Sequence, residues 1–263
     1  MLALRPIEVL IKWQSVNKKQ IMSNQLTSSL FTVNSVQVVA FFHPQTFPAF
    51  DAAKAVRTVL TGFAGLFDGQ MQVLPFAAEV PAELPRVILK SSDGVWTLAI
   101  SPLQINCTWM NQNESNVEID EASIFAKGAE VAFRYLSRLK LTAGRLGGIV
   151  VRFAACDDPA QKLIDHFCNE SSRHSPFARS TAFEVHNHKS YSPSWDGKVF
   201  AVNSWVRCQT TSGVKTGISV LQDINTLADP AAIFRAKMLS SYFAMVPYES
   251  TVILKRYFPT SEE

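Results

Sequence analysis

Two histidines separated by one residue, His186 and His188, have the types and spacing that most suggest a chemical site. Alternate residues of a β-strand point to the same side, so both imidazoles could face one metal ion. Two ligands do not complete a metal site, and the tripeptide borders a loop. We therefore expect no metal and no cofactor, and His186 and His188 remain only weak candidates for ligands.

A second candidate is a run of basic residues between positions 131 and 156 that contains no acidic residue. Its members are Arg134, Arg138, Lys140, Arg145 and Arg152. Clustered Lys and Arg neutralise phosphates, which makes this the candidate nucleic-acid-binding segment. A solvated helix end also explains it, because the helix dipole favours cations there. The net charge of +3 is too small to imply a polyanionic partner by itself.

Residue patterns that would indicate catalysis are nearly absent. The sequence has no Gly-x-Ser-x-Gly and no His-Glu-x-x-His. The acidic groups at 157–158 and 118–121 are better explained as helix-start caps than as acid–base pairs. Gly-rich 143–148 follows an expected helix and precedes a strand, whereas a phosphate cradle needs the reverse order. We expect 143–148 to end a helix and form a turn, and the chain to be non-catalytic, without excluding an enzyme.

Composition indicates a soluble protein of a reducing cytoplasm. The chain has 263 residues, of which 47% are hydrophobic and 18% charged, and no apolar run is long enough for a membrane span. Its four cysteines form no Cys-x-x-Cys pair, so neither a disulfide framework nor a zinc ribbon is indicated. Residues 1–30 are expected to be an extension: a short amphipathic helix, a disordered tail or a start-site artefact, with Met22 as the alternative first residue.

An internal repeat is the firmest pattern in the sequence. Residues 95–106 read VWTLAISPLQIN after a Ser-Ser-Asp-Gly turn, and residues 214–225 read VKTGISVLQDIN after Thr-Thr-Ser-Gly. Apolar residues at helical spacing follow in both copies, and we expect the helices to open near Ala122 and Ala231. The repeat predicts two units, 31–142 and 143–263.

The elements that must position these residues are strand, helix, several antiparallel strands and long helix, twice over. This predicts an α+β fold: a tandem duplication of a β-α-β(3-4)-α unit, with an antiparallel curved sheet covered by helices on one face. Apolar residues on both faces of 36–42 indicate a central strand. The opposite face of the sheet is expected to be open to solvent or to partners.

The duplicated β-α-β4-α order looks like the architecture of TATA-binding-protein-like and helix-grip folds. The tract Pro85–Gly94 and the segment Leu221–Asn225 also resemble a sporadically distributed family of bacterial proteins of about this length. That family has no established activity, so the resemblance implies a fold more than a function.

Three functional hypotheses follow from these patterns. The first is a non-catalytic bacterial protein that recognises a protein partner, as a regulatory, immunity or defence-associated factor. The second is nucleic-acid binding through the curved sheet or the basic segment. The third is binding of a small apolar ligand in a helix-grip cavity. The oligomeric state stays open.

Overall fold

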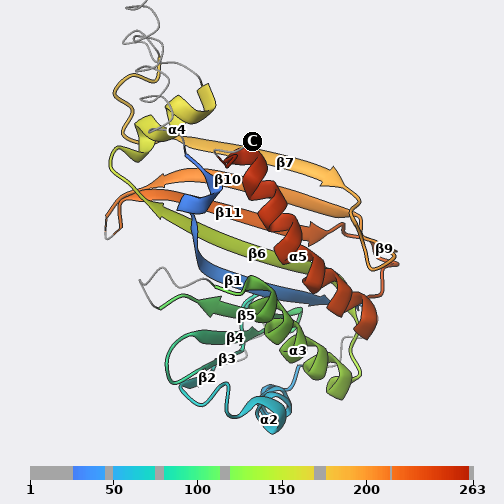
Figure 1. Ribbon diagram of the computed structural model, residues 1–263. Helices are drawn as coiled ribbons and strands as arrows, with labels where there is room; N and C mark the ends of the chain where they lie inside the picture. The colour runs from blue at the N-terminus through green and yellow to red at the C-terminus, as the bar shows by residue number, and fades with distance from the viewer. Residues whose placement is uncertain are drawn as a thin grey trace, which may run out of the picture.

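A single large antiparallel sheet organises the molecule (Figure 1). The computed structural model describes residues 26–44, 50–74, 80–112, 119–168, 176–213 and 215–260. Nine strands follow the order β2-β3-β4-β5-β1-β6-β11-β10-β7, and β8 and β9 form a separate hairpin. The predicted mixed fold with a large antiparallel sheet is confirmed.

The strands are β1 (Thr32–Phe42), β2 (Met71–Val73), β3 (Val87–Lys90), β4 (Trp96–Ile100), β5 (Gln104–Met110), β6 (Ala143–Ala155), β7 (Glu184–Tyr191), β8 (Ser194–Trp195), β9 (Lys198–Val199), β10 (Val202–Thr211) and β11 (Gly217–Thr226). The helices are the 3-10 turn η1 (Ser28–Leu30) and the α-helices α2 (Ala52–Phe63), α3 (Glu121–Leu139), α4 (Pro159–Cys168) and α5 (Ala236–Tyr257).

The two long strands β1 and β6 pair at the centre of the sheet. β5 flanks β1 on one side, and β11 flanks β6 on the other. Val36, Val38 and Ala40 of β1 are fully buried, and Val39 on the other face is also buried. The prediction that residues 36–42 form a central strand is therefore confirmed.

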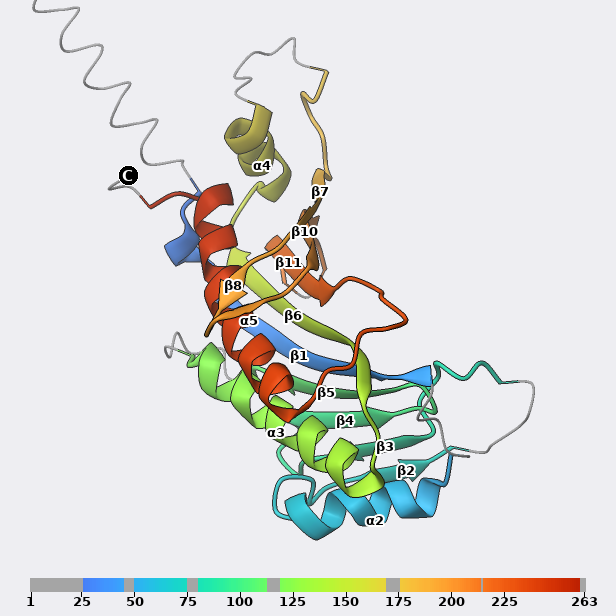
Figure 2. The same ribbon diagram turned by 90° about the vertical axis from the view of Figure 1, so that its right-hand side faces the viewer.

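Helices α3 and α5 lie side by side across one face of this sheet (Figures 1 and 2). α3 crosses β1 and β5, and α5 crosses β6 and β11. Two glycines permit the close approach. A Cβ atom on Gly128 of α3 would lie 2.7 Å from Val38, and one on Gly148 of β6 would lie 2.7 Å from Val246 of α5. The interior between helices and sheet is therefore closely packed.

A buried arginine connects the sheet to both long helices. Arg152 of β6 is 2% exposed, and its Nη2 donates to both carboxylate oxygens of Glu121 at 2.6 and 2.7 Å. The same nitrogen donates to Ser250 Oγ of α5 at 3.2 Å, and Nη1 donates to Gln222 of β11. Gln222 in turn donates to the Ser250 carbonyl. Burial lowers the pKa of Arg152, and the Glu121 carboxylate opposes that shift.

Two predicted boundaries are wrong. Gly-rich 143–148 is not a turn, because α3 ends at Lys140 in the left-handed conformation and Ala143 already begins β6. The second long helix does not open at Ala231. The backbone N–H of Phe234 bonds to the Ala143 carbonyl in an isolated bridge, so α5 begins only at Ala236.

Other predicted starts agree with the structure. Asp120 caps α3 by accepting from the backbone N–H of Ser123 at 3.1 Å, and α4 begins at Pro159, directly after the acidic residues 157–158. Of the predicted extension 1–30, residues 1–25 lie outside the described residues. Leu26 is buried, and the N–H of Ser28 donates to the Phe258 carbonyl, so 26–30 packs on the end of α5.

None of the described helices combines the length and the apolar character that crossing a membrane would require.

Arg152→Ala is expected to lower the free energy of unfolding by about 3–5 kcal/mol, because it leaves the largely buried Glu121 carboxylate without its counter-charge. Urea unfolding monitored by circular dichroism measures the loss. The control is Lys127→Ala, which removes an exposed ion pair with Glu130 and should cost about 1 kcal/mol or less.

A double-variant cycle of Arg152→Ala with Glu121→Ala should show a positive coupling energy, because the second substitution removes the orphaned charge. Equal losses for Arg152→Ala and Lys127→Ala would contradict this account of the buried network.

Candidate interaction surface on the helix-free face of the sheet

The side chains that point away from α3 and α5 form a surface that we call the helix-free face. Directly paired residues of antiparallel strands share a face, so the strand registers assign its members. They include Asn106 and Thr108 of β5; Gln37, Val39 and Phe41 of β1; Arg145, Ile149, Val151 and Phe153 of β6; Leu221, Asp223 and Asn225 of β11; Asn203, Trp205 and Arg207 of β10; and Glu184, His186 and His188 of β7. In Figure 2 no described helix crosses this side.

Apolar side chains of β6 and β11 occupy the middle of this face. Ile149, Val151 and Phe153 project from alternate positions of β6, and Leu221 lies directly opposite Val151. All four are partly exposed, whereas their neighbours on the helix side, such as Val150 and Val220, are fully buried. We call these four residues the apolar centre. A sheet face that only contacts water would carry polar residues here.

An aromatic group lies beside the apolar centre on the outer strands. Trp205 is 39% exposed, and the His188 ring stacks on it with centroids 4.0 Å apart and an interplanar angle of 14°. His186 contacts the same indole at 5.4 Å. Arg207 pairs with Glu184 across the same strands, with Nε 2.6 Å from the carboxylate. This end of the face thus offers an indole, two imidazoles and a neutralised charge pair.

The two histidines do share a face, as their spacing predicts. Their rings contact Trp205, and His188 Nε2 lies 3.2 Å from Asn203 Oδ1. No group of three or more His, Cys, Asp or Glu side chains suited to a metal occurs within the described parts of the chain. The arrangement of His186 and His188 is that of a packed aromatic group.

A polar cluster also borders the apolar centre, with Asp223 between Ile149 of β6 and Trp205 of β10. Asp223 is partly buried, and burial raises the pKa of its carboxyl, opposed by the Asn225 hydrogen bond and the Arg145 charge. Asn225 Nδ2 donates to Asp223 Oδ1 at 2.5 Å. The Arg145 guanidinium lies 5.2 Å from the centroid of the Phe41 ring. A partly buried carboxyl with a perturbed pKa and a nearby charge is a candidate member of a functional site.

The five basic residues predicted as one cluster lie in separate places. Arg134 and Arg138 lie on the outer side of α3, where Arg134 pairs with Glu130 and Arg138 donates to the Thr58 carbonyl. Lys140 ends that helix. Arg145 alone lies on the helix-free face, while Arg152 is buried against Glu121. The fold therefore does not bring these residues into one basic patch.

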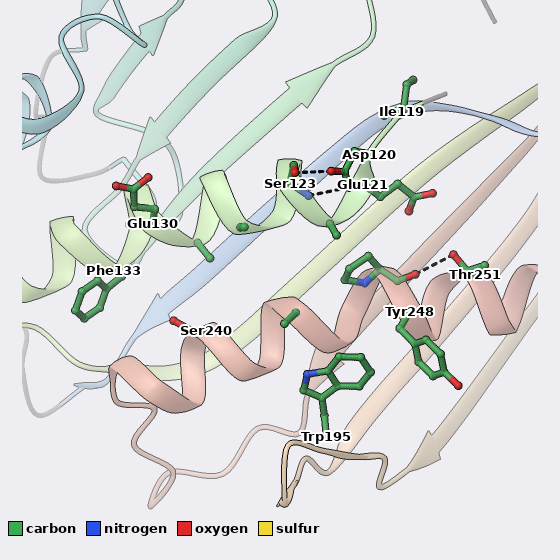
Figure 3. Close-up of a pocket in the computed structure, with 15 residues that line it drawn as sticks. Ile119, Asp120, Glu121, Ser123, Glu130, Phe133, Trp195, Ser240, Tyr248 and Thr251 are labelled. Atoms are coloured by element: carbon green, nitrogen blue, oxygen red, sulfur yellow. Dashed lines mark hydrogen bonds between the residues drawn. The ribbon is translucent and has the colours of Figure 1, made fainter. Parts of the chain in front are cut away.

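A groove between α3 and α5 is a hollow on the opposite side of the molecule (Figure 3). Small side chains such as Ala126, Ala129 and Ala244 line it, and Trp195 and Tyr248 flank it with ring centroids 5.4 Å apart. Glu121 lies at its edge, already paired with Arg152. The groove lies on the outer side of the helices and contains no unmatched charge that points to a ligand.

A serine, a lysine and an aspartate meet beside this groove. Lys198 Nζ lies 2.5 Å from Ser241 Oγ and 3.0 Å from Asp196 Oδ2. Lys198 donates both hydrogen bonds and forms an ion pair with Asp196. The cluster attaches the β8–β9 hairpin to α5, which makes its role structural.

The cysteines offer no activated nucleophile in the interior. Burial raises the pKa of Cys107 and of Cys208 to about 12. A thiol must ionise to act as a nucleophile, so these two side chains act as core residues.

Comparisons with protein-family models and with curated proteins give no match for this chain.

Sequence reasoning missed the most informative residues of this surface. Trp205 and Asp223 were not singled out, although each alternates with buried residues along its strand. Alternation could have placed both on one face. It could not have shown that they lie directly opposite each other, because their pairing depends on register.

Asp223→Asn is expected to stabilise the protein near neutral pH. The raised pKa means that the folded state holds the Asp223 proton more tightly than the unfolded state, so wild-type stability falls as pH rises through that pKa. Asparagine resembles the protonated carboxyl and removes this loss. Urea unfolding across a pH series should show an advantage at neutral pH that disappears in acid.

Asp120→Asn is the matched control of opposite sign. Hydrogen bonds from Ser123 lower the pKa of Asp120, so its ionised form stabilises the fold. The variant should be less stable than wild type at neutral pH, with a difference that shrinks as pH falls. An unchanged or lower stability of Asp223→Asn at neutral pH would contradict the assigned burial of Asp223.

Proposed function

We propose that this chain is a non-catalytic binding protein that recognises a protein partner through the helix-free face of its sheet. The observation that carries the proposal is the apolar centre, Ile149, Val151, Phe153 and Leu221, partly exposed on a face that no described helix covers. Burying such side chains against a partner is favourable by roughly 25 cal/mol per Å² of apolar surface.

The composition around the apolar centre matches that of protein interfaces. Aromatic residues and arginine are enriched at the cores of such interfaces, and a polar rim surrounds them. Here Trp205 adjoins the apolar centre, and Arg207, Glu184 and the amide side chains lie outside it. The partner we expect offers apolar side chains and few charges.

Electrostatics favours a protein over a nucleic acid. Arg145 and Arg207 on this face are matched by Asp223 and Glu184. A phosphate backbone requires several unmatched cations, so it would find little attraction here. A helix-grip cavity has less support, because Gly128 and Gly148 bring the helices into close contact with the sheet.

We also propose that residues 31–142 and 143–263 are two copies of one unit in a bacterial protein of a reducing compartment. In support, β1 and β6 are neighbours at the centre, β5 and β11 flank them, and α3 and α5 each cover one such pair. The biological role that we propose for it is a regulatory, immunity or defence-associated one.

Binding by this face is tested by capturing proteins on the immobilised chain from a lysate of its source organism, with quantification by mass spectrometry. Leu221→Asp and Trp205→Ala are expected to remove the same captured protein, because both side chains lie on the face. With that protein purified, calorimetry should show at least roughly ten-fold weaker binding for Trp205→Ala.

The matched control is Tyr248→Ala, which removes an exposed aromatic side chain from the α3–α5 groove and should leave capture unchanged. Loss of capture only with Tyr248→Ala would move the interface to the groove. Loss of capture after nuclease treatment, with a mobility shift at low salt, would replace the protein partner with a nucleic acid.

A further inference from the structure

We propose that Arg145, Asn225 and Asp223 form the polar specificity site of the helix-free face and bind an amide group of the partner. This inference rests on the proposed function and names the chemistry that the face recognises. The ligand group is the neutral amide of an Asn or Gln side chain or of the main chain.

Arg145 supplies the hydrogen-bond donor. Among the described residues, its Nε is buried and has no hydrogen-bond partner. Its guanidinium is held against the Phe41 ring, the residue directly opposite on β1. Because Nε itself is buried, a ligand oxygen would meet the outer Nη groups of the guanidinium, which make no hydrogen bond to another described residue.

Asp223 supplies the acceptor. Asn225 donates to its Oδ1, which fixes the carboxylate and leaves Oδ2 for a second donor. Asn225 is itself 7% exposed, so its amide is held in place by its surroundings. The Arg145 charge acts on Asp223 from nearby. A ligand group that carries one acceptor and one donor could therefore bind Arg145 and Asp223 together.

Gly147 leaves room above the central strands at this point. It lies between Val39 and Asn225 in the strand register, and a Cβ atom there would lie 2.5 Å from Asn225 Oδ1. The Asn225 side chain occupies the space that any other residue would fill. Gly147 thus lets the Asn225 side chain lie against the β6 backbone, which fixes its amide beside Asp223.

The charges of the site select among ligand groups. A carboxylate or phosphate would suit Arg145 but would face the Asp223 carboxylate, and an ammonium group would face Arg145. A neutral amide presents its oxygen to Arg145 and its N–H to Asp223 without either repulsion. Amides are the groups that every protein partner carries.

The test uses the full chain labelled with ¹⁵N and follows the Nε–Hε signal of Arg145, which is assigned by its loss in Arg145→Lys. Acetamide, N-methylacetamide, acetate and inorganic phosphate are titrated separately at equal concentrations. Acetamide or N-methylacetamide should give a saturable shift of this signal and of the Asn225 side-chain amide. Acetate and phosphate should bind at least roughly ten-fold more weakly, because of the Asp223 carboxylate.

Two variants make the result specific. Asp223→Ala should abolish the saturable shift by acetamide, whereas Glu184→Ala, on the same face but outside the site, should leave it unchanged. A larger response to acetamide assigns a side-chain amide, and a larger response to N-methylacetamide assigns a main-chain amide.

A stronger response to acetate or phosphate would overturn the proposal and make the site an anion site. No response to any of the four probes would also overturn it. Neither result alters the effect of Trp205→Ala and Leu221→Asp on partner capture, so failure of this inference is distinguishable from failure of the proposed function.

Discussion

A charged guanidinium between the sheet and its helices is the constraint on which the rest of this structure depends. Arg152 is buried on β6, where an unpaired charge would be very costly, and its partners come from three other elements. Glu121 begins α3, Gln222 belongs to β11 and Ser250 belongs to α5. Both long helices must therefore lie on the same face as Arg152, and no other helix of the described residues covers the opposite face.

Because the helices and the sheet are in close contact, a partner must bind at the outer surface of the molecule. Gly128 against Val38 and Gly148 against Val246 leave no room for a bulky group at those contacts. The α3–α5 groove on the outer surface is lined mainly by small side chains, and its Glu121 is already paired. The helix-free face combines apolar, aromatic and partly buried titratable groups, which is why it carries the functional proposal.

Much of the fold follows from local patterns in the sequence. Alternating and continuous apolar runs located the strands, the double-sided burial of 36–42 indicated a central strand, and Asp120 and Pro159 marked helix starts. The two wrong boundaries lie where a tertiary contact overrides the local sequence pattern. The glycines at 147 and 148 serve close approach within a strand, and the pairing of Phe234 with Ala143 delays the start of α5.

The sequence by itself determined which residues alternate on each strand. Only the tertiary structure decided which face of the sheet is buried beneath helices and which is exposed. Arg145 and Arg152 lie seven positions apart on β6 and therefore point to opposite faces. Arg152 is a buried link to two helices, whereas Arg145 is partly exposed on the other face, against Phe41 and near Asp223. In the sequence both are members of one basic cluster. Their difference in burial arises only when helices from distant parts of the chain cover one face of the sheet.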